Sequence, residues 1–308
     1  MTKPHASSRP HSAEFFGDWR DYWWNHDYLA LLARRWGFCR ARCALDVGCG
    51  VGHWSRALIK VLPAGSKLIG VDREAKWVEL AARRARQAGL GRRLSYQTAA
   101  AETLPFPDGS FDLVTCQTVL MHVREPKLVL AEMLRVLRPG GWLLAAEPNN
   151  RVSGGVLSSI NHEESVQTTL ARLRFELLCE RGKRALGLGD NSMGDLLPGW
   201  LAGLGCRDIS ASLNDKLIPL FPPYAALEQK VFLKQIEDWI QREVGIDAAD
   251  ETRRFFLAGG GSVREFSEHR RRIRQEGRAL LAAVRKGDYH CANGHLHYVV
   301  CARAPKSR

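Results

Sequence analysis

The segment ALDVGCGVGH, residues 44–53, constrains the fold of this chain more than any other stretch. An apolar run ends at Asp46, and glycines then follow at positions 48, 50 and 52 before a helix-like segment begins. Glycines accept positive φ angles and leave the backbone bare, so they suit a tight turn that a ligand approaches closely. The segment therefore predicts a strand, a ligand-binding turn and the start of a helix.

The order of residues in this turn distinguishes between two kinds of cofactor. Nicotinamide-binding folds use G-x-G-x-x-G to seat a pyrophosphate at the helix N-terminus, whereas here the third glycine comes one position early and Asp46 precedes the first. A carboxylate aimed into the turn would repel a pyrophosphate and attract an ammonium group. The turn therefore favours S-adenosylmethionine (SAM), which carries an α-amino group and a sulfonium. A nicotinamide enzyme and a purely structural glycine turn are the alternatives.

Strands and helices alternate with short connections from residue 43 onward. The patterns predict strands near 43–48, 67–72, 93–98, 111–117 and 141–147, and helices near 53–62, 74–88 and 125–137. Such alternation is typical of parallel βαβ units in a doubly wound sheet, which binds ligands at the carboxyl ends of its strands. We therefore expect an α/β fold whose motifs gather at that edge.

Polar residues follow the second, fourth and fifth predicted strands. Asp72 ends the second strand, where its carboxylate can accept both hydroxyls of a ribose or cap the next helix. His122 could take a proton from a hydroxyl or amine, because its ordinary pKa lies near neutral pH. Glu147, Asn149 and Asn150 could bind a polar or cationic substrate, and we assign His122 and Glu147 as candidate catalytic residues. The structural alternatives are a histidine bonded to backbone and a cap for the segment after the fifth strand.

Aromatic side chains are concentrated near the N-terminus, between Phe15 and Trp24. A helical pattern continues from them, which predicts an aromatic cap helix over residues 13–38. Such a helix could close over a pocket and offer a flat apolar or cation-attracting wall. Tyr22, Trp23 and Trp24 are therefore candidate acceptor-binding residues, and a helix packed on the sheet is the equal alternative.

Five motifs in a fixed order resemble the class I SAM-dependent methyltransferases, in the broad group that includes the ubiquinone and menaquinone biosynthesis enzymes. Within residues 43–148 they are DVGCGVG, VDRE, AETLPFPDGSFDLV, MHVREP and EMLRVLRPGGWLLAAEP. The resemblance implies a Rossmann-like, seven-stranded sheet with the last strand antiparallel, and SAM as the cofactor. It covers enzymes with many different substrates.

The resemblance also implies cofactor contacts, residue by residue. Those expected at the methionine end are Asp46, Gly48, Cys49 and Gly50. Asp72 would hold the ribose. Those expected beside the adenine or closing over the cofactor are Ala101, Glu102, Gln117 and Thr118. One position departs from the family, since Ala100 stands where such enzymes often place an aspartate that accepts the adenine amino group. We expect adenine recognition to shift to the backbone of Ala101 or to Glu102.

Beyond residue 150 the resemblance loosens and helical patterns dominate. Residues 151–204 predict helical segments, and the last two strands of the sheet are expected at 206–213 and 297–303. A hairpin would normally join these strands, but a helical insertion over residues 215–290 intervenes. We expect this insertion to form a lid or an oligomer surface and to roof the pocket together with the cap helix, within a single domain over residues 13–308.

Composition bears on partners and location. The chain of 308 residues carries a formal net charge of +12, which raises nucleic acid as a partner, but the arginines of residues 264–286 share an amphipathic helical pattern with glutamates. No apolar run approaches the roughly 20 residues that cross a bilayer, and the first residues lack the apolar centre of a signal peptide. Eight dispersed cysteines predict reduced thiols in a cytoplasmic protein, without disulfides or a metal site.

We therefore expect a methyltransferase that moves the methyl group of SAM to an oxygen, nitrogen or carbon nucleophile of a small or medium-sized metabolite. Because the donor is already activated, holding the acceptor lone pair in line with the methyl group can supply most of the effect. A base is needed only when the nucleophile arrives protonated. The alternatives are an RNA-modifying enzyme of the same fold and a SAM-binding protein without catalysis. The expected partners are the methyl acceptor and a second copy of the chain in a homodimer, with nucleic acid as the less favoured alternative and no membrane association.

Overall fold

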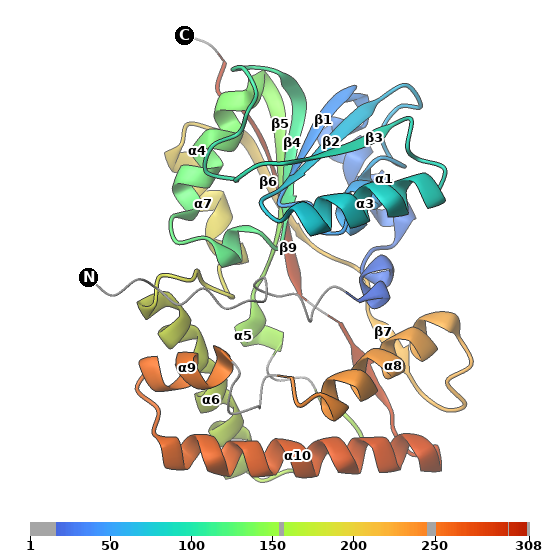
Figure 1. The fold of residues 1–308 in the computed structure, drawn as a ribbon, viewed down its shortest axis with the longest axis vertical. Coiled ribbons are helices and arrows are strands. Elements are labelled where there is room, and N and C mark those ends of the chain that lie inside the picture. Colours follow the sequence, from blue (N-terminus) through green and yellow to red (C-terminus); the bar gives the residue numbers. More distant parts are fainter. Residues whose placement is uncertain (1–16, 154–156, 245–250, 295, 307–308) are drawn as a thin grey trace.

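A computed structural model of the protein describes residues 17–153, 157–244, 251–294 and 296–306, and a seven-stranded sheet forms its centre (Figure 1). The strands of this sheet are β1 (Cys43–Val47), β2 (Lys67–Asp72), β3 (Leu94–Thr98), β4 (Phe111–Gln117), β5 (Leu137–Pro148), β6 (Arg207–Leu213) and β9 (His297–Arg303). Their order is β3-β2-β1-β4-β5-β9-β6. Strands β1 to β5 pair in parallel, whereas β9 is antiparallel to β5 and β6. The predicted α/β class with an antiparallel last strand is confirmed.

Both faces of the central strands are covered, which explains their unbroken apolar sequences. Consecutive residues of a strand point to opposite faces. Ala44 and Leu113 accordingly belong to one hydrophobic cluster, and Leu45 and Val114 belong to another on the opposite face. All four side chains are fully buried. The loops at the ends of β1 and β4 are therefore held by rigid strands.

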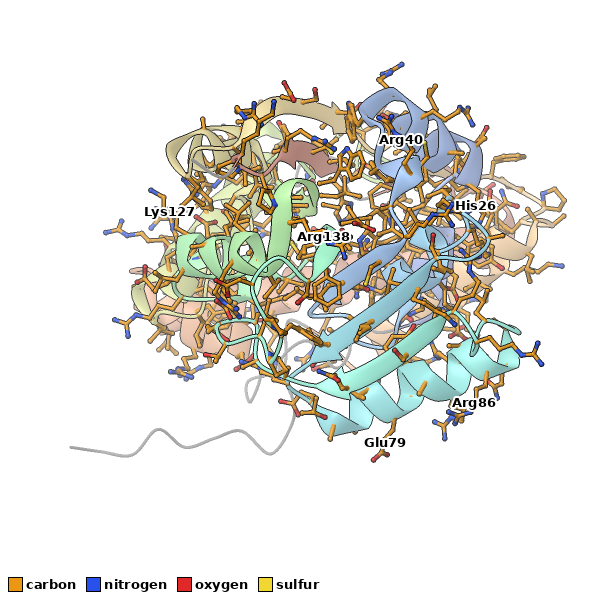
Figure 2. The ribbon with its side chains drawn as sticks, turned by 90° about the horizontal axis from the view of Figure 1, so that it is seen from above. His26, Arg40, Glu79, Arg86, Lys127 and Arg138 are labelled. Atoms are coloured by element: carbon orange, nitrogen blue, oxygen red, sulfur yellow. The ribbon has the colours of Figure 1, made fainter. Side chains whose placement is uncertain are left out.

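Helices cover the two faces of the sheet. Helices α1 (His26–Trp36), α2 (His53–Leu58) and α3 (Ala75–Gln87) pack on the first cluster, and α4 (Pro126–Val136) and α7 (Leu197–Gly203) pack on the second. Helix α3 turns Val78 and Ala81 inward and leaves Glu79 and Arg86 in solvent, as its amphipathic sequence predicts (Figure 2). Helices α2, α3 and α4 lie where the sequence predicts them, although α2 ends earlier, at Leu58.

A layer of helices lies beyond the carboxyl ends of the parallel strands (Figure 1). Its members are α6 (Val166–Ala185), α8 (Leu227–Gln241), α9 (Glu251–Ala258) and α10 (Val263–Lys286). Phe175, Phe256 and Phe266 of α6, α9 and α10 form a third, small cluster. The predictions did not include α9 or the separate two-stranded ribbon of β7 (Ile218–Leu220) and β8 (Cys291–Asn293). Short segments complete the described chain: η3 (Phe38–Arg40), η4 (Leu120–His122), η5 (Gly194–Leu196) and α5 (Asn150–Ser153).

The N-terminal segment forms two helices in place of one continuous cap helix. Residues 13–16 of the predicted helix lie outside the described residues, and the part that follows folds into η2 (Asp18–Tyr22) and then α1. Trp19 of η2 packs edge-on against Trp239 of α8, with the ring centroids 5.4 Å apart. Helix α8, from the predicted insertion, therefore supports η2.

Helix α10 is rich in basic residues, several of them paired with glutamates. On α10, Arg264 donates to Glu268 of the same helix at 2.9 Å, as expected of a solvated face that carries both signs of charge. Arg274 instead donates at 2.5 Å to Glu243, which follows α8. All eight cysteines are free thiols. Among the described residues, no helix is long and apolar enough to cross a membrane.

Candidate functional site

The glycine-rich turn leaves β1 at Gly48 and is pinned to the neighbouring strand. Cys49 donates its backbone N–H to the carbonyl of Val71 in β2, at 2.8 Å. Gly48 has φ +68°, and a Cβ atom built on it would lie 2.4 Å from a methyl group of Val119. Only glycine fits such a position, because L-residues are strained at this φ and the added carbon would overlap a neighbour. The turn consequently presents bare backbone beside the end of β4.

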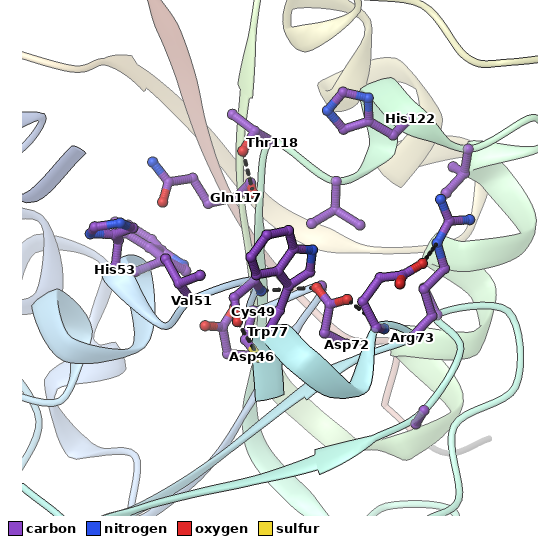
Figure 3. A pocket seen from close by; sticks show the side chains of 18 of the residues that line it. Asp46, Cys49, Val51, His53, Asp72, Arg73, Trp77, Gln117, Thr118 and His122 are labelled. Carbon is purple, nitrogen blue, oxygen red and sulfur yellow. Dashed lines mark hydrogen bonds and ion pairs between the residues drawn. The ribbon is translucent and has the colours of Figure 1, made fainter. Parts of the chain in front are cut away.

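A cavity opens at this point, at the carboxyl ends of β1, β2 and β4 (Figure 3). The structure brings every residue predicted to contact the cofactor into its wall: Asp46, Gly48, Cys49, Gly50, Asp72, Ala101, Glu102, Gln117 and Thr118. His122 also lines this cavity. The loops after three neighbouring strands meet there, as expected at the switch point of a doubly wound sheet.

Asp46 places a buried carboxylate under the turn. Its side chain is 1% exposed, and one of its oxygens accepts a hydrogen bond from the hydroxyl of Ser55. The other oxygen, Oδ1, has no hydrogen-bond partner within the described residues. Burial raises the pKa of Asp46 to about 7, and the charge of Asp72 adds to this effect. A cation bound beside Oδ1 would stabilise the ionised form, so this position suits an ammonium group.

Asp72 serves the turn and the cavity together. Its carboxylate accepts the N–H of Gly50 at 2.9 Å and the N–H of Glu74 at 3.0 Å. It therefore holds the turn before α3, although the N-cap of that helix is Glu74 and not Asp72. A carboxylate offers about four acceptor sites in all, and Asp72 also lines the cavity. It therefore keeps capacity for two hydroxyl groups of a ligand.

The adenine is expected beside Ala101 and Glu102. Ala101 and Glu102 line the cavity, and so does the indole of Trp77 from α3. Ala100, the position that departs from the resembling family, is exposed and forms a β-bridge with Thr103. Trp77 was not predicted, and its ring offers a flat apolar surface of the kind on which a purine stacks.

Arg20 of η2 is a residue of the cavity wall that sequence reasoning missed. Its guanidinium donates to the Thr118 hydroxyl at 3.4 Å and lies 4.4 Å from the ring centroid of Trp23. Burial lowers the pKa of Arg20 to about 10, so it stays charged at neutral pH. Thr118 has φ +53°, an outlier for a β-branched residue of the kind that clusters at functional sites. No local pattern in the sequence signals either feature.

A polar cluster fastens η2 beside the cavity. His53, which lines the cavity, donates from Nδ1 to Asp21 at 2.7 Å, and Arg56 donates to the same carboxylate at 2.6 Å. Arg84 donates to Asp18 at 2.9 Å and to His53 Nε2 at 3.2 Å. Burial lowers the pKa of His53 to about 4, so the ring is neutral and can satisfy both contacts. This cluster fixes the segment that carries the cavity residue Arg20.

Tyr22, Trp23 and Trp24 lie away from the wall of the cavity, in contrast to their predicted role in acceptor binding. Trp23 and Trp24 are 8% and 7% exposed and belong to the main hydrophobic cluster, against which Tyr22 also packs. Trp24 lies 4.8 Å from Trp54 between ring centroids, and Trp23 lies 4.9 Å from His297. Large aromatic rings gain most free energy by such burial. Their placement agrees with the alternative, a helix packed on the sheet.

The helical insertion was predicted to roof the pocket. Among its described residues within 215–290, none lines the cavity.

Glu147 also lies behind the cavity. It is completely buried and accepts the backbone N–H groups of Val119, Leu120 and Met121 at 2.8, 3.0 and 3.3 Å. Burial raises its pKa to about 7. Its carboxylate therefore organises the loop after β4, and this geometry differs from the predicted catalytic contact.

The two asparagines after β5 are bonded within the fold, Asn149 through its side chain and Asn150 through its backbone. Asn149 Oδ1 accepts the N–H of Arg151 at 3.2 Å, and Asn149 Nδ2 donates to Asp195 at 3.2 Å. The N–H of Asn150 donates to the carbonyl of Asn191 at 3.4 Å. Neither lines the cavity, so the placement again favours the structural alternative over acceptor binding.

Comparison with known proteins identifies the family of this chain. Residues 45–145 match the methyltransferase domain family. A ubiquinone biosynthesis O-methyltransferase from Ralstonia nicotianae is 30% identical over 175 residues, which cover 53% of this chain and 71% of that enzyme. This chain belongs to the SAM-dependent methyltransferases of class I. The resemblance seen in its motifs is thereby confirmed, and SAM is the cofactor of the family.

Further comparisons set the extent of the match. The ubiquinone biosynthesis O-methyltransferase of Methylococcus capsulatus is 32% identical over 162 residues, 49% of this chain and 66% of that enzyme. The chain spans about half the length, or less, of several other curated relatives. A crystal structure from Bacillus halodurans C-125, provisionally assigned as a methyltransferase, has TM-score 0.51 and 17% identity over 91% of this chain and 100% of that one. At such identity the likeness shows the shared fold alone.

The cavity of this methyltransferase fits SAM on its own chemistry. Asp46 has an unmatched buried oxygen for an ammonium group, and Asp72 has acceptor capacity for ribose hydroxyls. Gly48, which lies between them in the sequence, leaves its backbone accessible, because a side chain at this position would overlap Val119. Charge, hydroxyl recognition and space therefore agree with the cofactor that the family uses.

We expect Gly48→Ala to weaken SAM binding more than tenfold and to lower the free energy of unfolding by about 1–3 kcal/mol. The added Cβ would lie 2.4 Å from Val119, and the residue would keep φ +68°. Gly89→Ala is the matched control, because Gly89 has φ +71° with no atom within 4 Å of an added Cβ. Gly89→Ala therefore introduces the backbone strain without the steric overlap. Calorimetry and urea unfolding of both variants separate the two effects, and equal SAM affinity in both would contradict the role of Gly48.

Proposed function

We propose that the protein transfers the methyl group of SAM to a nucleophilic atom of a small or medium-sized metabolite. The observation that carries the proposal is the cavity at the ends of β1, β2 and β4. Asp46 and Asp72 both line it, and Asp46 has a buried oxygen without a hydrogen-bond partner among the described residues. A protein that used its glycine turn for a pyrophosphate would not place a buried carboxylate beneath it. The proposal therefore rests on charge as well as on fold.

The residues of the chain have binding and orienting roles in this proposal. When bound, SAM supplies a methyl group that is already activated by its sulfonium. Asp46 would hold the α-amino group, Asp72 the ribose and Glu102 the adenine edge. Their task is to fix the direction of the methyl group, because an oriented encounter can supply most of the rate enhancement. No acid or base is required for that task.

The acceptor is expected beside Arg20, Thr118 and His122. These side chains line the same cavity and have no part in the contacts proposed for Asp46 and Asp72. Their donors suit an oxygen-containing group, and the Ralstonia and Methylococcus relatives are named as O-methyltransferases. We therefore favour an oxygen nucleophile on a metabolite, ahead of nitrogen or carbon.

Calorimetric titration with SAM tests the cofactor, and incubation with methyl-labelled SAM and a fractionated cell extract tests the acceptor. We expect micromolar-range binding of SAM, and label in a small-molecule fraction that resists ribonuclease. The Gly48→Ala variant is the negative control in the same extract. No binding at millimolar SAM would overturn the methyltransferase proposal, and label confined to RNA would overturn the small-molecule acceptor.

We also propose that the protein works in the cytoplasm. All eight cysteines are free, and Cys49, Cys116, Cys206 and Cys301 are buried. Burial raises the pKa of Cys49 well above its ordinary value, so this thiol beside the cofactor stays protonated. Free thiols of this kind persist in a reducing compartment. Localisation of a tagged full-length chain would test this part of the proposal.

A further inference from the structure

A buried lysine lies directly behind His122. Lys183 belongs to α6, outside residues 45–145 that match the methyltransferase domain. Its side chain is 1% exposed, which is unusual for a lysine unless its ammonium group is hydrogen-bonded. His122, in turn, lines the cavity (Figure 3). Through this lysine, the part of the chain that follows residues 45–145 contacts a residue of the cavity wall.

The ammonium group of Lys183 has three acceptors around it. The Nζ atom lies 3.0 Å from the carbonyl oxygen of Met121, 3.3 Å from Nδ1 of His122 and 2.5 Å from Oδ1 of Asn191. An ammonium carries three N–H donors and no acceptor. Each donor thus has one partner. Because the ammonium group can only donate, His122 must accept this hydrogen bond with the lone pair of Nδ1. A neutral imidazole with a lone pair on Nδ1 carries its proton on Nε2.

We propose that Lys183 is a positioning residue that fixes His122 as the Nε2–H tautomer, so that the imidazole offers a hydrogen-bond donor to an acidic oxygen of the methyl acceptor. This inference rests on the proposed function and names its substrate class, an acceptor whose hydroxyl is acidic enough to bind as an oxyanion, such as a phenol or an enol. Arg20 lines the same cavity and adds a positively charged donor beside the neutral imidazole. An oxyanion needs no base before it attacks the methyl group.

Carboxylates surround the lysine on several sides, yet burial dominates its titration. Burial lowers the pKa of Lys183 to about 8, and four carboxylates oppose this effect by favouring the charged form. These are Asp190, Glu251, Glu180 and Glu147. Above that pH the neutral amine gains a lone pair and can accept a hydrogen bond from Nδ1–H, which permits the other tautomer of His122. The proposed arrangement is therefore a property of the charged lysine, present at neutral pH.

Nitrogen NMR of protein labelled with 15N-histidine tests the tautomer without any methyl acceptor. The His122 signals are assigned by their loss in His122→Gln. At pH 7 we expect the Nε2–H pattern, changing toward Nδ1–H as the pH rises through about 8. In Lys183→Met, which keeps the apolar stem, the preference for Nε2–H should weaken to that of a free neutral imidazole, with a measurable Nδ1–H fraction at pH 7. In Asn191→Asp, a carboxylate beside the ammonium should move the transition upward by about one pH unit or more.

The controls distinguish failure of this inference from failure of the proposed function. Lys230→Met removes an exposed lysine of α8 and should leave the His122 signals unchanged. Lys183 does not line the cavity, so a folded Lys183→Met variant should still bind SAM, as calorimetry would show. If Lys183→Met is unfolded, the Asn191→Asp transition decides. A wild-type Nδ1–H pattern at pH 7, or the same pH dependence in Asn191→Asp, would overturn the role of Lys183 while leaving SAM binding intact.

Discussion

Glu147→Ala is expected to remove a large part of the free energy of unfolding of this protein. Three backbone N–H groups, from Val119, Leu120 and Met121, donate to the Glu147 carboxylate in a fully buried site. Each buried donor left without a partner costs about 1–3 kcal/mol, and a folded domain has only about 5–15 kcal/mol in total. Urea unfolding should therefore show a greatly lowered midpoint or no folded state.

Glu147→Gln is the matched variant, because it keeps the shape and one carbonyl acceptor. We expect it to fold and to lose the pH dependence that Glu147 confers. The folded-state pKa of Glu147 is about 7, above its ordinary value of 4.5. Stability from this group is therefore fully present below pH 4.5 and is lost as the pH rises through 7. If Glu147→Ala were as stable as the wild type and failed only in methyl transfer, Glu147 would have the catalytic role and not the structural one.

The part of the site that could be predicted is the part that local sequence order determines. Asp46, Gly48 and Asp72 occupy fixed places in strand–turn–helix units, and parallel strands bring their carboxyl ends to one edge whatever else the chain does. The same reasoning placed His122 after β4. All four line the cavity. Their geometry follows from short segments, so residue order was sufficient.

Residues whose role depends on distant contacts could not be predicted. Arg20 bonds Thr118, 98 positions away, and Lys183 bonds His122, 61 positions away. No periodicity or motif links such pairs, because only the tertiary fold brings them together. Arg20 was one arginine among aromatic residues, and Lys183 was one basic residue on a predicted helix.

A third group shows where sequence leaves two roles open. Trp23, Trp24 and Asn149 have residue types that suit binding and packing equally well, and their burial in the fold decides between them. The tryptophans enter the core, and Asn149 makes capping contacts. The insertion is a similar case. The hydrophobic pattern predicts its helices, but it does not predict that Trp239 of the insertion contacts Trp19 of η2. Hydrophobic patterning sets which face is buried, whereas the partner of that face is a tertiary property.

Asp46→Asn is expected to weaken SAM binding by about ten- to a hundredfold at pH 8, and to abolish its pH dependence. A hydrogen bond to a charged group contributes about 1.5–3 kcal/mol, and about 1.4 kcal/mol corresponds to a factor of ten in affinity. In the wild type the pKa of Asp46 is raised to about 7 by burial. The ionised form attracts the ammonium group, so wild-type affinity should rise between pH 6 and 8 as the proton leaves.

Asp238→Asn is the control for this substitution, because Asp238 is a half-exposed residue of α8 that pairs with Arg242. It changes the same charge far from the cavity and should keep the wild-type affinity and pH profile. Calorimetry at pH 6, 7 and 8 on the three proteins separates the local carboxylate from the net charge. Because Asn keeps the shape of Asp, the amide can still accept from Ser55, and the fold should survive. Equal SAM affinity in Asp46→Asn and Asp238→Asn at pH 8 would mean that the oxygen without a partner under the glycine turn does not hold the ammonium group, and the orientation of the cofactor proposed for this cavity would have to be reversed.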